Sequence, residues 1–317
     1  MKLIIQIPCF NEEKTLPSTL LDFPKNIQGV DIIETQVIDD GSTDATLEVA
    51  ESLKVNHIVS FKRNRGLAEA FKAGVDNALI NGADILVNTD GDNQYRGEDI
   101  PKLIKPILDG KADIVIGGRP IHTHPEFSLF KRIMQKVGSF VLRKISNTTV
   151  EDAASGFRAY SKNALLRMNI YSQFSYCMET LIQAGLSNLK IVCVDIRINK
   201  RTRDSRLFKN IFEYIWKQGK TMATIFLLYR ANWIFNFIAI NILLLSFFFV
   251  LRYMILTIFF SAPAASFWPS IILSGALFIA AVLVFFAGIL ASLISSVRKL
   301  CEDINYRIKK LEIDSKG

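Results

Sequence analysis

Residues 84–95 read DILVNTDGDNQY, and the organisation of the rest of the chain can be worked out from this stretch. The apolar run at 85–87 has the length and branched side chains of a buried strand, so Asp90 and Asp92 stand where a strand ends and the chain turns. Asp, Gly and Asn also favour turns that bind nothing, so the stretch alone is compatible with a plain turn. The sequence on either side of it decides between a plain turn and a binding site.

Apolar strand patterns alternate with helical patterns up to about Arg119. The predicted strands lie at residues 3–7, 32–38, 57–61, 84–88 and 113–118. Helical patterns follow residues 11–16 and 42–47 and cover residues 66–80 and 98–108. Regular alternation is typical of an α/β fold, with a mostly parallel sheet covered by helices on both faces.

The carboxyl ends of parallel strands meet at one edge of such a sheet, where α/β proteins bind their ligands. The polar residues that follow the predicted strands are Asn11 and Glu12, Asp39 and Asp40, Asn64 and Arg65, Asp90 and Asp92, and Arg119. The glycine motifs of dinucleotide-binding folds and of phosphate-loop NTPases are missing from the sequence. Asp90, Asp92 and Gln94 instead place oxygen atoms on alternate residues. We expect them to hold Mg²⁺ or Mn²⁺ on a nucleotide diphosphate.

Six blocks of sequence resemble, in order, the family 2 glycosyltransferases of the GT-A (Rossmann-like) type. They read IPCFNEEKTL (7–16), VIDDGSTDAT (37–46), NRGLAEAFKAGVDNA (64–78), DILVNTDGDNQY (84–95), DIVIGGR (113–119) and EDAASGFRAYSKNAL (151–165). The branch they resemble contains dolichyl-phosphate mannose synthases and bacterial polyprenyl-phosphate glycosyltransferases. The resemblance implies a membrane-bound inverting glycosyltransferase. Such an enzyme moves a sugar from a UDP- or GDP-linked donor to undecaprenyl or dolichyl phosphate, which gives a lipid-linked monosaccharide.

The resemblance also implies roles for individual residues. Nucleotide-sugar binding falls to Pro8, Asn11, Glu12, Asp39, Asp40, Arg65 and Asp90. The metal motif comprises Asp90, Asp92 and Gln94, with Gly91 and Asn93 where the branch usually has a small and an apolar residue. The acceptor phosphate is assigned to Arg119, Arg132 and Arg201, with Arg203 and Ser205 beside them. Asp39 also suits the end of a strand and the cap of a helix expected from about Ser42.

A phosphate acceptor accounts for the basic residues after the fifth predicted strand. A hydroxyl acceptor needs a general base, whereas a phosphate already carries negative oxygens and needs cations. Asp152 completes the catalytic set of Arg119, Arg132 and Arg201, either by orienting the acceptor or as a base. Transfer to a hydroxyl of a glycan or lipid, with Asp152 as base, is therefore the alternative. The block that contains Asp152 and Arg158 resembles the family block that lies over the donor sugar. Glu179 suits contact with the sugar hydroxyls and equally suits a solvated helix face.

Two uncharged runs near the carboxyl end predict a transmembrane hairpin. Residues 231–251 and 253–297 carry no charge, and each run is long enough to cross a bilayer. Basic residues flank both ends of the hairpin, so the positive-inside rule places the catalytic domain in the cytoplasm, at the inner (plasma) membrane of a multi-pass protein. Small residues such as Gly275 and Gly288 could mediate a homo-oligomer through these helices.

The predicted domains are a catalytic domain at 1–203, juxtamembrane amphipathic helices at 204–230, two transmembrane helices at 231–297 and a basic cytoplasmic tail at 298–317. The formal charge of +8 fits a surface beside anionic lipid. Nucleic-acid binding is not expected, because the chain has no compact basic run or nucleic-acid motif. The four cysteines lack metal-ligand spacing.

Two other classes of function would leave different marks in the sequence. A processive polysaccharide synthase would carry a Q-x-x-R-W element, and this sequence has none. A non-catalytic membrane scaffold would have no need of the three predicted metal ligands, all of which are present. Absence of nucleotide-sugar turnover would identify such a scaffold.

Overall fold

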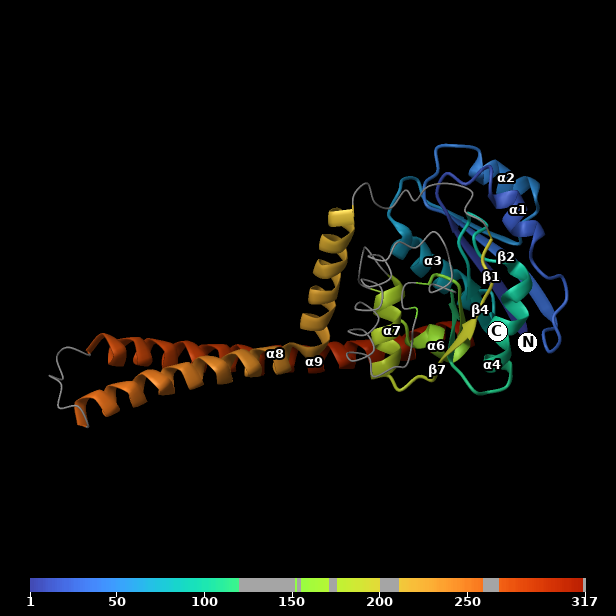
Figure 1. Cartoon of the computed structure of the whole chain (residues 1–317). Coiled ribbons are helices and arrows are strands. Elements are labelled where there is room, and N and C mark those ends of the chain that lie inside the picture. Colours follow the sequence, from blue (N-terminus) through green and yellow to red (C-terminus); the bar gives the residue numbers. More distant parts are fainter. Residues whose placement is uncertain (120–151, 153–154, 171–175, 200–210, 259–267, 316–317) are drawn as a thin grey trace. The chain divides into compact units, whose positions relative to one another are not determined.

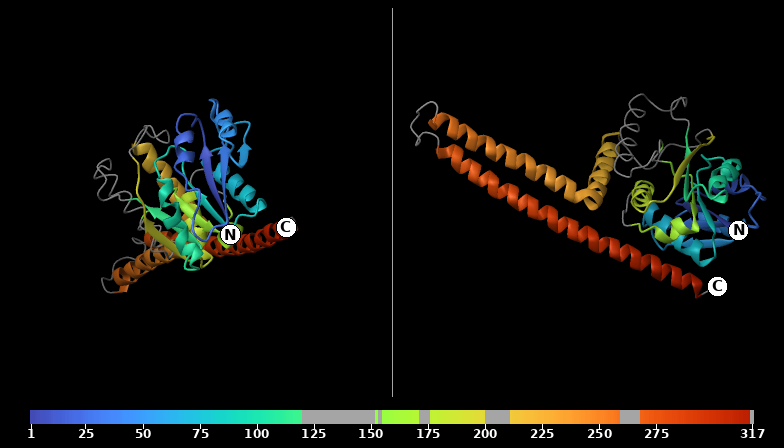
Figure 2. Two further views of the ribbon diagram at one scale, coloured as in Figure 1. Left: turned by 90° about the vertical axis from the view of Figure 1, so that its right-hand side faces the viewer. Right: turned by 90° about the horizontal axis from the view of Figure 1, so that it is seen from below.

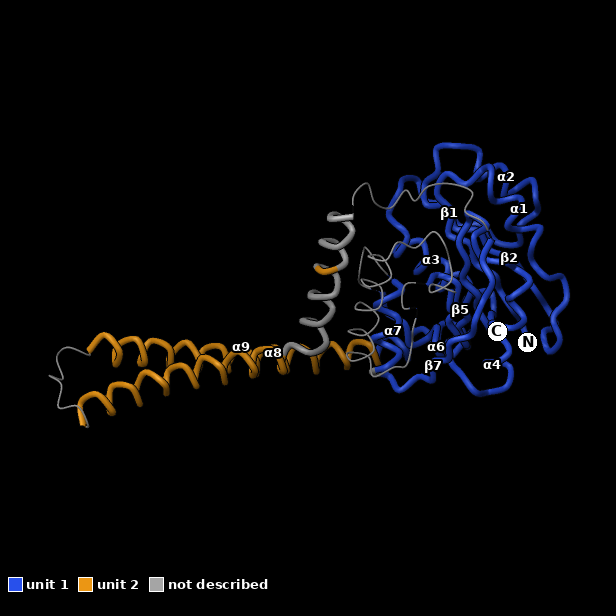
Figure 3. Tube along the Cα trace, viewed as in Figure 1, with its two compact units in different colours: residues 1–214, 304–317 blue, residues 215–303 orange. Residues whose placement is uncertain are grey.

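The computed structural model describes residues 1–119, 152, 155–170, 176–199, 211–258 and 268–315 (Figure 1). The chain divides into two compact units (Figure 3). The first comprises residues 1–214 and 304–317, and the second comprises residues 215–303.

A seven-stranded sheet forms the centre of the first unit. Its strands are β1 (Lys2–Cys9), β2 (Ile32–Asp39), β3 (His57–Ser60), β4 (Ile85–Asn88), β5 (Ile114–Gly118), β6 (Arg158–Ser161) and β7 (Ile191–Asp195). Their order is β3-β2-β1-β4-β6-β5-β7, and β6 runs antiparallel to both of its neighbours. The predicted mostly parallel sheet is confirmed, and its five predicted strands are β1 to β5. The sequence patterns did not predict β6 and β7.

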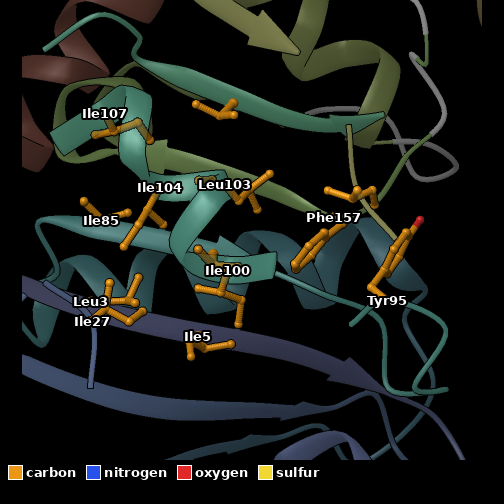
Figure 4. Close-up of a cluster of buried hydrophobic side chains, with 14 of the residues drawn as sticks. Leu3, Ile5, Ile27, Ile85, Tyr95, Ile100, Leu103, Ile104, Ile107 and Phe157 are labelled. Carbon is orange, nitrogen blue, oxygen red and sulfur yellow. The ribbon is translucent and has the colours of Figure 1, made fainter. Parts of the chain in front are cut away.

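Helices cover both faces of this sheet. They are α1 (Leu16–Leu21), α2 (Thr46–Ser52), α3 (Leu67–Ile80), the 3₁₀ helix η1 (Gly97–Asp99), α4 (Ile100–Leu108), α6 (Lys162–Arg167) and α7 (Tyr176–Leu186). The alternation of side chains along β1 decides which helix meets which face. Leu3 and Ile5 pack with α4 (Figure 4), whereas Gln6 points to the opposite face and donates to the Phe71 carbonyl of α3 at 3.4 Å.

Helix α2 begins later than predicted. The expected start near Ser42 is wrong, because residues 42–45 lie in a loop and the helix begins at Thr46. Asp39 Oδ1 accepts from the Ser42 N–H at 3.0 Å, and Asp44 Oδ1 accepts from the Thr46 N–H at 3.0 Å. Short acidic side chains that bond to nearby backbone compete in this way with helix formation.

Gly41 shapes the loop between β2 and α2. Its φ is +71°, and a Cβ atom there would lie 2.4 Å from the backbone carbonyl carbon of Arg63. Gly82 has a similar φ of +74°, but no described heavy atom lies within 4 Å of its Cβ position. We expect Gly41→Ala to lower the free energy of unfolding by about 1–3 kcal/mol more than Gly82→Ala, because overpacking adds to the shared backbone strain. Denaturant titrations in detergent measure this difference, and equal losses would show that the loop has room for a methyl group.

The second unit contains most of two long helices, α8 (Ile211–Ile258) and α9 (Trp268–Asp314). The segments Asn232–Ile258 and Trp268–Asp314 are long and apolar enough to be candidate membrane spans. Within this unit the helices run antiparallel (Figure 2), because Ser246 meets Ser274 while Phe235 meets Gly288.

Serine hydroxyls join the two helices of this hairpin. Ser246 Oγ donates to the Ser274 carbonyl at 2.9 Å, and Ser274 Oγ can donate to the Ser246 carbonyl at 3.0 Å. Arg252 donates to Ser270 Oγ at 2.7 Å. A Cβ atom on Gly288 would lie 3.0 Å from Phe235 Cβ, so the packing surface expected at Gly288 is used inside the hairpin. Small and hydroxyl side chains of this kind let apolar helices approach closely.

The last turns of α9, from Ile304 onward, belong to the first unit. Lys309 Nζ lies 3.1 Å from Asp76 Oδ1 of α3. The Arg167 guanidinium of α6 lies 4.8 Å from the centre of the Tyr306 ring. The end of the predicted basic tail is therefore packed against the sheet unit.

Candidate active site

Polar residues gather at the carboxyl edge of the sheet, as the alternation of elements predicts. Asp40 follows β2, Asp90 follows β4, and Arg119 directly follows β5. A Cβ atom on Gly91 would lie 3.2 Å from Glu12 Cγ, so the loops after β1 and β4 are in contact. These four polar side chains thus come from strands whose ends meet at a single edge.

The segment Thr89–Arg96, which we call the metal loop, carries the three predicted metal ligands. Asp92 Oδ1 accepts from the Gln94 N–H at 3.1 Å, which turns the chain tightly between these two residues. Burial of Asp90 and the nearby charge of Asp92 raise the pKa of Asp90 to about 7, against the opposing charge of Arg119. Two carboxylates therefore repel each other in a partly desolvated loop.

The metal loop fits a divalent cation. A cation between Asp90 and Asp92 would relieve their repulsion, and the amide oxygen of Gln94 is a third donor of the same hard type. Among the described residues, no group of three or more His, Cys, Asp or Glu side chains is placed to hold a metal. Mg²⁺ commonly takes one or two protein carboxylates and completes its shell with water and substrate phosphates.

Asp40 connects the loops after β2 and β3. Its Oδ1 accepts from the Arg65 N–H at 2.7 Å, and its Oδ2 accepts from the Gly66 N–H at 2.9 Å. Burial raises the pKa of Asp40, although these backbone donors oppose the shift. The Arg65 guanidinium lies 4.8 Å from the centre of the Phe61 ring. The two predicted nucleotide-binding residues Asp40 and Arg65 are therefore neighbours.

The loops after β1 and β2 also interlock. Asn11 Oδ1 accepts from the Thr43 N–H at 2.8 Å, and the Glu12 N–H donates to Thr46 Oγ1 at 2.8 Å. Asp39 Oδ2 accepts from Ser60 Oγ at 2.8 Å, so Asp39 ends its strand and holds a turn, and does not cap a helix. Pro8 is buried within β1.

Arg119 and Asp152 form a two-pronged ion pair. Arg119 Nε donates to Asp152 Oδ2 at 2.7 Å, and Nη2 donates to Oδ1 at 3.0 Å. The exposed fractions of the side chains are 15% for Arg119 and 2% for Asp152. Burial lowers the pKa of Arg119, but the charges of Tyr95, Asp152 and Asp90 raise it by more, so the guanidinium stays charged. Both oxygens of the candidate base are thus engaged by a cation.

Several predicted residues lie outside the described part of the chain. These are Arg132, Arg201, Arg203 and Ser205. The assignment of an acceptor-phosphate site to them stays a prediction.

A family comparison covers the part of the first unit that contains the described site residues. The model of the family described as "Glycosyl transferase family 2" matches residues 4–168, which include the metal loop and the Arg119–Asp152 pair. The chain is a family 2 glycosyltransferase. The resemblance in the six sequence blocks is thereby confirmed.

Curated relatives of this glycosyltransferase include two named enzymes. It is 31% identical over 214 residues to the UDP-N-acetylglucosamine–dolichyl-phosphate N-acetylglucosaminyltransferase of Methanococcus voltae, covering 60% of this chain and 83% of the relative. It is 30% identical over 225 residues to the dolichol-phosphate mannosyltransferase of Pyrococcus furiosus, covering 68% of this chain and 62% of the relative.

Among solved structures, the fold is similar to glucosyl-3-phosphoglycerate synthase from Mycobacterium tuberculosis, crystallised with Mn²⁺, UDP and glucosyl-3-phosphoglycerate. The TM-score is 0.54 at 20% sequence identity, over 71% of this chain and 78% of that one. This similarity confirms the predicted GT-A-like fold.

This glycosyltransferase also contains a polar network around Asn88 that the sequence patterns did not predict. Asn88, the last residue of β4, accepts from Gln6 Nε2 at 2.9 Å. Its own amide nitrogen donates to the Gly156 carbonyl at 3.0 Å and to the Tyr176 hydroxyl at 2.9 Å. A Cβ atom on Gly156 would lie 3.0 Å from Asp90 Oδ1. The signal in the sequence is the asparagine itself, because a polar residue ends an apolar strand two residues before Asp90.

Arg158 and Glu179 are both buried. Arg158 is fully buried in β6, where it donates to the Cys177 carbonyl at 2.8 Å and to Thr180 Oγ1 at 3.0 Å. Arg158 therefore ties β6 to α7. Glu179 has an exposed fraction of 2%, so its expected alternative on a solvated helix face is wrong.

Proposed function

We propose that this chain is a membrane-bound, inverting glycosyltransferase that moves a sugar from a nucleotide diphosphate sugar to a polyprenyl phosphate, with Mg²⁺ or Mn²⁺ as cofactor. An oxygen of the lipid phosphate attacks the anomeric carbon. The bond from that carbon to the nucleotide's phosphate oxygen breaks, and the nucleoside diphosphate leaves on the opposite face. The product is a lipid-linked monosaccharide.

One observation carries the proposal: Arg119, held by Asp152 in an ion pair directly after β5, lies at the same edge of the sheet as the metal loop that follows β4. A cation-binding carboxylate pair and a permanently charged guanidinium thus share one edge of the sheet. Asp90, Asp92 and Gln94 would hold the divalent cation, which when bound would supply positive charge for the leaving diphosphate. Arg119 offers a second, protein-derived positive charge for a second phosphate. Two phosphates, one on the donor and one on the acceptor, match this arrangement.

The ion pair supports a positioning role for Asp152. A general base must be available to take a proton, but both oxygens of Asp152 accept hydrogen bonds from Arg119. A phosphate acceptor needs no such base, because it is already anionic. Asp152 therefore aligns the Arg119 fork in the proposed reaction, and the alternative with a hydroxyl acceptor is the weaker reading.

The remaining assignments follow from the same reaction. Pro8, Asn11, Glu12, Asp39, Asp40 and Arg65 are proposed to line the nucleotide side of the site. Arg132, Arg201, Arg203 and Ser205 are proposed to assist Arg119 at the acceptor phosphate. UDP and GDP are both candidate nucleotides, and the relative named for a UDP-linked sugar favours UDP.

The lipid acceptor accords with the apolar helices and with the relatives. Both named relatives carry dolichyl or dolichol phosphate in their names. We propose that the two candidate spans form a hairpin in the inner membrane, with the catalytic unit in the cytoplasm. We also propose that the domains end at residues 203, 230 and 297, as the sequence predicts. A homo-oligomer that forms through the two helices is part of the same proposal.

The proposal is tested by incubating the purified full-length chain in detergent with undecaprenyl phosphate and a panel of UDP- and GDP-sugars. We expect one donor to give a radiolabelled glycolipid when Mn²⁺ or Mg²⁺ is present, and none to do so in EDTA. A chain that turns over no donor under any of these conditions would be the non-catalytic scaffold.

A further inference from the structure

The segment Arg197–Asn199 runs along the metal loop and is bonded to it at several points. Ile198 forms an antiparallel bridge with Tyr95. The Asn199 N–H donates to the Gln94 carbonyl at 2.8 Å. Arg197 anchors the other end, with Nη2 at 2.8 Å from Asp99 Oδ1. Residues more than 90 positions apart are thus joined directly beside two predicted metal ligands.

The side chain of Asn199 makes the contacts that matter most for the ligands. Its Nδ2 donates to the Asn93 carbonyl at 3.0 Å, and its Oδ1 accepts from Arg96 Nε at 3.0 Å. The Asn93 carbonyl and the Gln94 N–H belong to one planar peptide unit. That N–H is the group that donates to Asp92 Oδ1 at 3.1 Å. Holding the carbonyl therefore aims the N–H at the ligand carboxylate.

The peptide unit between Asn93 and Gln94 follows a residue in a strained backbone conformation. Loss of its hydrogen bond to Asn199 would allow this peptide unit to rotate. Asn93 has a φ of +55°, in the left-handed region that few residues other than glycine adopt. Its own Oδ1 is buried and has no hydrogen-bond partner among the described residues. Within the described residues, the Asn93 side chain makes no hydrogen bond through this oxygen, and Asn199 restrains the peptide unit from another part of the chain.

We propose that Asn199 is a positioning residue for the metal site. It fixes the peptide unit between Asn93 and Gln94, and through the Gln94 N–H it holds the Asp92 carboxylate in the orientation that binds the divalent cation. Residues that orient a metal ligand through a hydrogen bond typically contribute about 10–100-fold to metal affinity. This inference rests on the proposed metal role of Asp92.

The test is Asn199→Ala, with Mn²⁺ binding measured by electron paramagnetic resonance of free Mn²⁺ in the presence of UDP and, separately, GDP. We expect the Mn²⁺ concentration for half-saturation to rise about 10-fold or more. Nucleotide binding in EDTA, measured by calorimetry, should change less than about twofold, because the described hydrogen bonds of Asn199 go to the metal loop, whereas Asn11 and Asp40 bond to other loops. If Asn199 merely stabilised the fold, its replacement would weaken Mn²⁺ binding and nucleotide binding together.

Two controls isolate the peptide contact. Arg96→Met removes the other bond of the Asn199 side chain and should leave Mn²⁺ affinity within about threefold. Asn56→Ala removes an asparagine that accepts from the Thr35 N–H at 2.9 Å, away from the metal loop, and should leave Mn²⁺ binding unchanged. If wild type and Asn199→Ala bind Mn²⁺ equally, the positioning role is wrong. If wild type itself binds no Mn²⁺ with either nucleotide, the metal assignment of the proposed function fails instead.

Discussion

Replacing Asp92 with Asn is expected to lower sugar transfer by about 100-fold or more, the size of effect seen when a group that stabilises developing charge is removed. The substitution keeps the side-chain shape, and its amide oxygen can still accept from the Gln94 N–H that now lies 3.1 Å from Asp92 Oδ1. The negative charge that a hard divalent cation requires is lost. Initial rates at saturating donor and Mn²⁺ measure the effect.

Asp109→Asn is the matched control for this prediction. Asp109 is an acid at the end of α4 that forms salt bridges with the exposed side chains of Lys105 and Lys111. It should keep full activity, because surface ion pairs contribute little. Undiminished transfer by Asp92→Asn in EDTA would show that the metal loop holds no catalytic cation.

Loss of either member of the Arg119–Asp152 pair is expected to destabilise the protein strongly. Arg119→Ala and Asp152→Ala should each lower the free energy of unfolding by about 3–5 kcal/mol, because each leaves a buried charge without its partner. The double variant Arg119→Gln with Asp152→Asn should recover most of this loss, since it contains no unpaired charge. Chemical denaturation in detergent provides the measurement.

Transfer should not recover with stability in the same double variant. We expect it to stay about 100-fold or more below wild type, because the cation proposed for the acceptor phosphate is gone. Nucleotide binding should change little, as Asp40 and Arg65 are untouched. Wild-type rates of transfer by the double variant would show that the Arg119–Asp152 pair only stabilises the fold and does not act on the acceptor.

The parallel part of the sheet could be predicted because it is encoded locally. Each of the strands β1 to β5 is an apolar run bounded by turn residues, and the residues after each run follow directly from the strand assignment. The strand β6 could not be predicted from pattern. It pairs Arg158 with Asn88, and a partner 70 residues away is set by tertiary packing and not by periodicity.

The same limit applies to the site. The metal loop is contiguous in sequence, so residue type and spacing suffice to propose its ligands. The partners that orient those residues are distant: Asp152 lies 33 residues from Arg119, and Asn199 lies 106 residues from Asn93. Nothing in the composition of either segment indicates these contacts, since Asp and Asn are common in caps and turns. The start of α2 was misplaced for a related reason, as local bonds of Asp39 and Asp44 favour a turn.

The central claim, that the acceptor is a lipid phosphate, is tested most directly by offering the full-length protein undecaprenyl phosphate and undecaprenol side by side, with the same radiolabelled nucleotide sugar and Mn²⁺. The account predicts that the phosphate lipid is glycosylated and the alcohol is not, because Arg119 recognises a phosphate and Asp152 is not available as a base. Glycosylation of the alcohol at a comparable rate would contradict it and would make Asp152 the base of a hydroxyl transferase.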